Sequence, residues 1–180
     1  MSLKERVYSV LVVSASDSFN TVASSLLSES HYSPVRFVSD ISSAKRAVSD
    51  RSYDFVIINA PLPDDIGMRF AIDAGELKGT VVLFLIRSEY HDEIHHRVVE
   101  HGIFTLPKPL SKPSMINALN WMATAREKLR RAEKKTLSIE EKMDEIRLVN
   151  RAKWILISEK GMDEADAHRF IEKQAMDRCI

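Results

Sequence analysis

The sequence predicts an α/β doubly wound fold with a five-stranded parallel sheet, followed by a long coiled-coil helix and a small all-α helical module. Three observations lead to this prediction. Short apolar runs alternate with amphipathic segments from residue 7 to about residue 110, no glycine or proline occurs between Ser114 and Lys160, and apolar residues recur in that stretch with a seven-residue period. We therefore expect one domain over 1–112 and a helical part over 113–180.

Five segments have the composition of buried strands. Four are continuous apolar runs, of the kind that lies in a parallel sheet covered on both faces. The remaining segment is weaker and lies between the first two of these runs. The strands are expected at 7–13, 34–38, 55–58, 81–86 and 104–106.

Four amphipathic segments separate the strands and are expected to be helices. In a doubly wound sheet, functional sites form at the carboxyl ends of the strands, so the loops there are the places to search. The helices are expected at roughly 17–30, 41–52, 66–77 and 91–101, and the loops are 14–17, 59–65, 86–89 and 107–109.

The second half of the chain has the pattern of a coiled coil. Ser111 can cap the start of a long helix, and Pro113 is tolerated in its first turn. Nine of the ten core heptad positions are apolar, and the seam ends after Ile146 because the next core positions are polar. The predicted dimer seam consists of Met115, Ala118, Met122, Ala125, Leu129, Ala132, Thr136, Ile139, Met143 and Ile146.

Two alternatives remain for this long helix. The heptad is compatible with an intermolecular coiled coil and with packing of the helix onto the chain's own domain. Ser138 and Glu141 form a capping-box pattern inside the helix, so a continuous helix and a break near 136–138 are both compatible with the sequence.

A further helix is expected after Gly161. Glycine suits the left-handed residue that ends a helix, and Asp163 can cap a new helix that has Asp166 at its third position. The two helical segments should face each other through apolar residues. These are Val149, Ala152, Ile155 and Leu156 on one segment and Ala167, Phe170 and Ile171 on the other, with the polar Gln174 on the same face.

The composition is that of a globular protein, with 44% hydrophobic and 29% charged residues. Basic and acidic residues are equal in number, 26 of each, so any contact with nucleic acid would come from a local basic patch. The single cysteine excludes an internal disulfide and a cysteine-rich metal site, and it fits a cytoplasmic location. No apolar stretch is long enough for a signal peptide or a membrane span.

The first half resembles the receiver domain of two-component response regulators, over essentially all of 1–112. The matching segments are DFVIINAPLPDDIG over 54–67 and PKP over 107–109. In receivers the third strand ends in the phospho-accepting aspartate, with proline four residues on and glycine eight residues on. Counting back from Pro63 and Gly67 places Asn59 at that position. Lys108 matches the lysine that contacts the phosphoryl group, usually before a cis peptide bond.

The other positions of the receiver site lack the residues its chemistry requires. The resemblance would place an acidic pair for Mg²⁺ at Ser14 and Ala15, and a threonine or serine at Ile86. Mg²⁺ needs carboxylate oxygens, phosphoryl transfer depends on the metal, and an amide is a poor nucleophile. Together with Asn59 and Lys108 these positions form a degenerate phospho-site, at which we expect no phosphorylation, catalytic residue or cofactor.

Two further groups of residues are interpreted as structural. Asp17, Asp64 and Asp65 lie near the site but at no matching position, and they are expected in ordinary solvated turns. Four histidines gather in the fourth predicted helix, and with no further ligand set evident they are expected to be exposed rather than metal-binding. These histidines are His91, His95, His96 and His101.

Residues from about 124 to 180 resemble the ANTAR domain, an RNA-binding transcription antitermination module that is often attached to a receiver. The resemblance implies a three-helix module on a coiled coil, which dimerises, binds a two-hairpin RNA element and prevents a terminator from forming. The family's third helix would begin just beyond Ile180. The matching segments are IRLVNRAK at 146–153, ILI at 155–157, GMDEADA at 161–167 and IEKQAMDR at 171–178.

Basic residues of this module are the candidate RNA contacts, although acidic residues are almost as numerous around them. The basic run at 126–135 is interpreted as a solvated coiled-coil face. Trp154 is the only large aromatic here that could stack on an RNA base, and burial against Phe170 is its expected alternative. The candidate contacts are Arg147, Arg151, Lys153, Arg169, Lys173, Gln174 and Arg178.

The leading hypothesis is a dimeric RNA-binding transcription antitermination regulator of the ANTAR response-regulator family, which is not an enzyme and is not controlled by aspartyl phosphorylation. Its expected partners are an RNA hairpin element, a second copy of the chain, and a sensor or regulator protein, without a membrane. The alternative hypothesis is a protein-interaction or dimerisation module of a signalling pathway that does not bind RNA.

Overall fold

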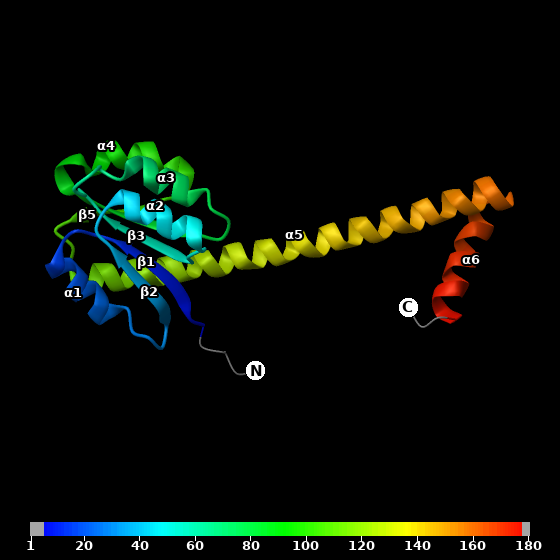
Figure 1. Cartoon of the computed structure of the whole chain (residues 1–180), viewed down its shortest axis with the longest axis horizontal. Coiled ribbons are helices and arrows are strands. Elements are labelled where there is room, and N and C mark those ends of the chain that lie inside the picture. Colours follow the sequence, from blue (N-terminus) through cyan, green and yellow to red (C-terminus); the bar gives the residue numbers. More distant parts are fainter. Residues whose placement is uncertain (1–5, 178–180) are drawn as a thin grey trace. The chain divides into compact units, whose positions relative to one another are not determined.

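The computed structural model describes residues 6–177, and the first half of the chain forms a five-stranded sheet (Figure 1). The strand order is β2-β1-β3-β4-β5, and every neighbouring pair is parallel. The predicted doubly wound sheet is confirmed, with strand ends that differ from the prediction by a few residues. The strands are β1 (Tyr8–Val13), β2 (Tyr32–Val38), β3 (Phe55–Asn59), β4 (Val81–Arg87) and β5 (Phe104–Lys108).

Helices cover both faces of this sheet because its central strands are apolar on both sides. One core cluster lies beneath α2, α3 and α4, and a second lies beneath α1 and the first part of α5. These helices are α1 (Asp17–Leu26), α2 (Ile41–Asp50), α3 (Met68–Gly75), α4 (Ser88–Val98) and α5 (Lys112–Lys160), with the 3-10 turn η1 (Val99–His101) after α4. α4 begins directly after β4, earlier than the predicted start at residue 91.

The helix α5 is continuous, so the break considered near 136–138 does not occur. Ser111 caps its start as predicted, since the Ser111 Oγ accepts a hydrogen bond from the Ser114 amide at 3.2 Å. A run of residues without glycine or proline leaves nothing that would end the helix before Lys160.

The first part of α5 packs on the sheet of its own domain. Met115, Ala118 and Met122 are buried in the cluster beneath α1 and α5, and Ala125 packs against the edge of that cluster. The prediction that these four residues belong to a dimer seam is therefore wrong. The physical reason is that the sheet needs an apolar cover on this face, and the same heptad stripe provides it within one chain.

Beyond this segment the heptad stripe is exposed. The chain forms two compact units that meet in α5 after Arg130, so the first domain extends past the expected boundary at residue 112. Among residues 6–177, nothing covers the rest of the predicted seam. Its exposed residues are Leu129, Ala132, Thr136, Ile139, Met143 and Ile146.

The second unit contains the later part of α5 and the helix α6 (Glu164–Asp177). Gly161 adopts φ = 63° and its amide donates to the carbonyl of Ile157 at 3.1 Å, which ends α5 as predicted. The Asp163 carboxylate accepts from the Asp166 amide at 2.7 Å, so the predicted cap of α6 is also confirmed. Among residues 6–177, no helix combines the length and the apolar character that a membrane crossing requires.

Candidate functional site

The carboxyl ends of β1, β3 and β5 bring Ser14, Asn59 and Lys108 together. The Lys108 Nζ donates to the Asn59 Oδ1 at 2.8 Å, and the Asn59 Nδ2 donates to the Ser14 Oγ at 3.0 Å. Three residues that are far apart in the sequence thus form one hydrogen-bonded chain, in which the lysine ammonium meets an amide instead of a carboxylate.

Both neutral members of this chain are buried. Ser14 is 2% exposed and Asn59 is 6% exposed. The Ser14 Oγ also accepts from the Ser16 amide at 3.2 Å, and the Asn20 Nδ2 donates to the Ser14 carbonyl at 3.4 Å. Buried polar groups are costly without partners, and here the two side chains supply partners to each other.

Lys108 is held from several sides. Its ammonium also donates to the carbonyl of Ala60, its own carbonyl accepts from the Ser88 Oγ at 2.7 Å, and the peptide bond to Pro109 is cis. Burial lowers the pKa of Lys108, and the positive charge of Arg87 lowers it further. No carboxylate contacts this ammonium within residues 6–177 to oppose these two effects.

The two remaining positions of the degenerate site contribute no polar side chain. Ala15 is exposed beside Ser14, and Ile86 is buried in the core cluster beneath α2, α3 and α4. Within the described part of the chain, no group of three or more histidine, cysteine, aspartate or glutamate side chains is placed to hold a metal ion.

Asp64 and Asp65 are exposed as expected, and both also accept hydrogen bonds from backbone amides. The Asp64 carboxylate accepts from the amides of Ile41 and Ser42 at 3.0 and 3.1 Å, and it thereby helps to cap α2. The hydrogen bond from the Ile41 amide is the main cause of the lowered pKa of Asp64. Asp65 accepts from the amide of Gly67 at 2.6 Å. Sequence reasoning missed the cap by Asp64 because its partner helix lies elsewhere in the sequence.

Gly67 is the residue that starts α3, with φ = 89°. A Cβ at this position would lie 3.2 Å from the Ile58 Cγ2, so both the backbone conformation and the close packing favour glycine. The predicted spacing from Asn59 to this glycine therefore has a structural basis in the turn.

The histidine cluster differs from its expectation in part. His91 and His95 are half-buried and stack with ring centres 5.6 Å apart. Both share hydrogen bonds with the Thr105 Oγ1, at 3.2 Å for His91 and 2.6 Å for His95. The expectation of exposure is wrong for these two, because β5 places a hydroxyl beneath α4, whereas His96 and His101 are exposed as expected.

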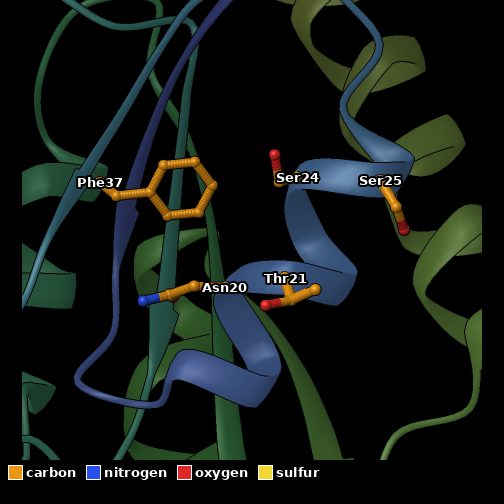
Figure 2. A pocket seen from close by; sticks show the side chains of 5 residues that line it. All are labelled: Asn20, Thr21, Ser24, Ser25 and Phe37. Atoms are coloured by element: carbon orange, nitrogen blue, oxygen red, sulfur yellow. The ribbon is translucent and has the colours of Figure 1, made fainter.

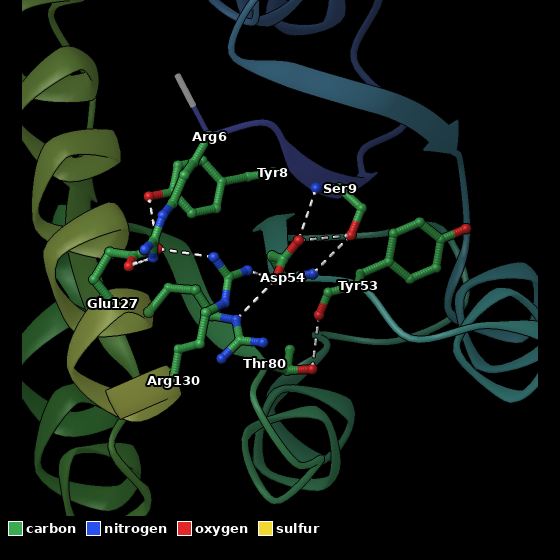
Figure 3. Close-up of polar contacts among 9 residues, drawn as sticks. Arg6, Tyr8, Ser9, Tyr53, Asp54, Thr80, Glu127 and Arg130 are labelled. Carbon is green, nitrogen blue, oxygen red and sulfur yellow. Dashed lines mark hydrogen bonds and ion pairs between the residues drawn. The ribbon is translucent and has the colours of Figure 1, made fainter. Parts of the chain in front are cut away.

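A cluster of ion pairs fixes α5 at the opposite ends of the strands (Figure 3). Asp54 accepts from the amide and the hydroxyl of Ser9, each at 3.0 Å, from the Arg126 Nε at 2.8 Å and from the Arg130 Nη2 at 3.2 Å. Burial raises the pKa of Asp54, but the hydrogen bonds from Arg126 and Ser9 outweigh burial and lower it overall.

Glu127 extends this cluster toward the start of the chain. Its carboxylate accepts from the Tyr8 hydroxyl at 3.2 Å and from the Arg130 Nη1 at 2.9 Å, and it pairs with Arg6. We call Asp54, Arg126, Glu127 and Arg130 the α5 clasp. The interpretation of the basic run as a solvated face is wrong for Arg126 and Arg130, since both bind the first domain.

A surface hollow of about 610 Å³ lies between α1 and β2 (Figure 2). Its lining residues are Asn20, Thr21, Ser24, Ser25 and Phe37. None of these side chains is ionisable, and the hollow therefore offers hydrogen bonds and one aromatic ring but no acid, base or metal ligand.

The candidate RNA contacts of the second unit have different environments. The side chain of Lys153 is only 18% exposed, with its Nζ 3.8 Å from Glu164 on α6. Arg147 and Arg169 are both exposed, and each pairs with an aspartate on its own helix. Arg147 lies 3.2 Å from Asp144, and Arg169 lies 3.1 Å from Asp166.

Arg151 and Lys173 are exposed, whereas Gln174 is half-buried. Gln174 lines an apolar hollow of about 430 Å³ between α5 and α6, and the other lining residues are Ala152, Ile155, Leu156, Phe170, Ile171 and Ala175. Arg178 lies outside the described residues. The structure thus leaves Arg147, Arg151, Arg169 and Lys173 as the accessible members of the predicted set.

Trp154 is not buried against Phe170, so that expectation is wrong. Its side chain is 71% exposed on α5. The ring of Phe170 lies instead under the ammonium of Lys160, 5.7 Å away. The reason is the position of Trp154 around the axis of α5. The helix α6 packs on the side of α5 that carries the half-buried residues Ala152 and Leu156, and Trp154 lies on another side.

Residues 138–180 match the family model of the ANTAR domain. This part of the chain is an ANTAR domain. Over 153 residues the chain is 25% identical to the transcriptional regulatory protein PdtaR of Mycobacterium tuberculosis, in strain CDC 1551 / Oshkosh and in strain H37Rv. The match covers 85% of this chain and 75% of PdtaR.

The domain before the ANTAR domain has the fold of a receiver. It is similar to the signal receiver domain of an HD domain-containing protein from Pseudomonas fluorescens Pf-5, with a TM-score of 0.62, 22% identity, and coverage of 73% of this chain and 96% of that one. It is also similar to the chemotaxis response regulator CheY4 of Vibrio cholerae, with a TM-score of 0.56, 21% identity, and coverage of 64% and 98%. At these identities the likeness shows the fold alone.

Proposed function

We propose that this chain is an RNA-binding transcription antitermination regulator of the cytoplasm, that it works as a dimer, and that aspartyl phosphorylation does not control it. The observation that supports this most is the order of its parts, a receiver-like fold followed by an ANTAR domain over 138–180. Its role is regulatory rather than enzymatic, in keeping with the name of its relative PdtaR.

The chemistry of the degenerate site supports independence from phosphorylation. Asn59 offers an amide where a nucleophilic carboxylate would be needed, and its oxygen is already engaged by Lys108 at 2.8 Å. Ser14 and Ala15 supply no carboxylate for Mg²⁺, without which the charge that develops on a transferring phosphoryl group is not neutralised. The input to this domain is therefore a binding event, such as contact with a sensor or regulator protein.

Phosphorylation is tested with acetyl phosphate. We expect the intact mass of the full chain to stay unchanged after incubation with acetyl phosphate and Mg²⁺, because the site lacks both nucleophile and metal ligands. A receiver that carries the acidic pair and the aspartate serves as the positive control. An adduct of one phosphoryl group on this chain would contradict the proposal.

RNA binding is tested on the full chain with a pool of two-hairpin RNAs whose loops are randomised, over a series of salt concentrations. We expect saturable binding with a preference among loops, and an affinity that falls as salt rises because arginine contacts release counterions from the phosphates. Arg151→Gln should weaken binding, whereas Arg46→Gln on α2 is the matched control and should leave it unchanged.

The alternative function is a protein-interaction module without RNA binding. The apolar hollow between α5 and α6, with Phe170 and Ile155 partly exposed, is the observation that favours it. Absent binding, or binding that is equal for every loop sequence and for Arg151→Gln, would support this alternative over an antiterminator.

A further inference from the structure

Trp154 is the most exposed tryptophan, tyrosine or phenylalanine side chain among residues 6–177, at 71%. A large aromatic ring in water forfeits the free energy that its burial would contribute, about 25 cal/mol per Å² of apolar area. Tryptophan combines a large apolar ring with one N–H donor and is enriched on recognition surfaces. The neighbours of Trp154 indicate what it recognises.

Three of the four residues one turn from Trp154 on α5 are polar, and the fourth, Ile157, is half-buried. Arg151 precedes it by three residues and Asn150 by four, and Ser158 follows it by four, so all three share its face of the helix. Arg147 lies two turns away on the same side. Each of these side chains is exposed, and Arg147 pairs only with the equally exposed Asp144 on its own helix.

The packing of α6 leaves this face open. The residues of α5 that line the hollow facing α6 include Ala152 and Leu156, and the Lys153 ammonium approaches Glu164 on α6. Trp154 belongs to neither set. Its ring and the two guanidinium groups of Arg147 and Arg151 are therefore accessible to the same ligand from solvent within the second unit.

An aromatic face beside two guanidinium groups suits an unpaired nucleotide. Bases in single-stranded loops stack on aromatic side chains, and arginine binds the phosphates on either side with a planar, charged fork. A paired base offers no free face, so a protruding indole favours loops over stems. An amide such as that of Asn150 can add a hydrogen bond to a base edge.

We propose that Trp154 is a stacking platform for an unpaired base of a bound RNA loop, and that Arg147 and Arg151 contact the phosphates next to that base. This inference rests on the proposed RNA-binding function and adds the part of the RNA that is read. Trp154 thereby determines a preference for loops, whereas the arginines contribute affinity that depends on salt.

A second copy of the chain is the competing occupant of this face, and the residues argue against it. The apolar heptad positions end at Ile146, and the next two core positions are Asn150 and Lys153. Covering Trp154 with another helix would remove water from Asn150 and Arg151 and leave their polar groups without partners. A nucleotide supplies those partners.

The chain has two tryptophans. The test uses the full chain with Trp121→Phe, in which Trp154 is the only tryptophan left. A two-hairpin RNA with unpaired loops and a fully paired duplex of equal length are titrated separately. We expect the loop RNA to quench the indole fluorescence and the duplex to leave it nearly unchanged. In the otherwise native chain, Trp154→Ala should weaken loop binding about tenfold or more, and Trp154→Phe should restore most of it.

Salt dependence separates stacking from charge. Trp154→Ala should leave the slope of log affinity against log salt unchanged, whereas Arg151→Gln should reduce that slope by about 0.7–0.9. Trp121→Ala is the matched control, since Trp121 is an exposed tryptophan of the first domain, and it should not alter RNA affinity.

Each contrary outcome has a distinct meaning. Failure of the native chain to bind either RNA would overturn the proposed function and this inference together. Loop binding that Trp154→Ala leaves unchanged would overturn the inference alone. Loss of a dimer by Trp154→Ala in light scattering without RNA would assign Trp154 to an interface between copies and would likewise overturn the inference.

Discussion

The ammonium group of Lys108 has a polar but uncharged partner, the side-chain amide of Asn59. The Asn59 amide oxygen and the Ala60 carbonyl both accept from its ammonium. A hydrogen bond to a charged group contributes about 1.5–3 kcal/mol, while a buried acceptor that loses its donor costs about 1–3 kcal/mol. The lysine thus has a structural role that does not require a phosphoryl group.

We expect Lys108→Met to lower the free energy of unfolding by about 1–3 kcal/mol, because Asn59 and Ala60 would lose their donor while the volume is nearly kept. Urea unfolding followed by circular dichroism measures this. Lys45→Met, on the exposed surface of α2, is the control and should change stability by less than about 0.5 kcal/mol. Equal effects of the two substitutions would refute the structural role of Lys108.

The positions of Ser14, Asn59 and Lys108 could be predicted from the sequence because each lies at the carboxyl end of a strand. Parallel strands bring their carboxyl ends to one edge of the sheet, so the residues had to meet. The environments of Trp154 and Asp64 could not be predicted in this way. Each depends on how one helix is oriented against another part of the chain, and the local apolar periodicity does not predict that orientation.

At the scale of the element, α5 carries one apolar stripe whose two consecutive parts have different surroundings. Its first part covers the sheet and its later part is bare within one chain. The α5 clasp lies where these parts meet, with Asp54 receiving hydrogen bonds from Arg126 and Arg130. The clasp thus holds the last packed turns of α5 on the first domain.

We expect Asp54→Asn to destabilise the first domain by about 1–3 kcal/mol at neutral pH, since the amide loses the charge that Arg126 and Arg130 face. The folded-state pKa of Asp54 is lowered, so its contribution is present above the unfolded value of about 3.9 and is lost as pH falls through the folded value. The difference between the native chain and Asp54→Asn should therefore vanish in acid.

Chemical denaturation at several pH values between neutral and acid measures this difference. The matched control is Asp73→Asn, which removes an exposed i,i+4 partner of Arg69 on α3. Its effect should be only a few tenths of a kcal/mol and nearly independent of pH. A gap for Asp54→Asn that persisted below its folded pKa would show that the carboxylate charge is not the cause.

The sequence indicated both ends of α5 and the cap of α6 correctly, since Ser111, Gly161 and Asp163 act locally. It did not indicate which part of the heptad stripe covers the sheet. Apolar periodicity shows that a helix face needs cover, but the partner that covers it lies at β1 and β3, distant in sequence. The α5 clasp was missed for the same reason, because Asp54 and Arg126 are separated by the rest of the domain.

For the whole molecule, the exposed part of the heptad stripe is the basis of the proposed dimer. Ile139 and Ile146 are 49% and 59% exposed in the single chain. An exposed apolar stripe with a seven-residue period is typical of a helix that pairs with another copy. The first three residues of the predicted seam are buried and Ala125 is partly buried, so the proposed contact between copies begins at Leu129.

We expect the full chain to be a dimer at micromolar concentration and the variant Ile139→Glu with Ile146→Glu to be a monomer, because glutamates at core heptad positions place buried charges opposite each other. Multi-angle light scattering measures the masses. Leu137→Glu is the control, since Leu137 is as exposed as Ile139 but lies off the seam. A native chain that remained monomeric would contradict the dimer.

The pairing of Asn59 with Lys108 also has a consequence for timing. An acyl phosphate on an aspartate is removed by hydrolysis, and that reaction limits how long a phosphorylated domain stays active. The contact between Asn59 and Lys108 is a hydrogen bond with no covalent group whose hydrolysis could set a lifetime. A domain governed by binding alone responds along a saturable curve of ligand concentration, and its response decays at the rate at which that ligand dissociates.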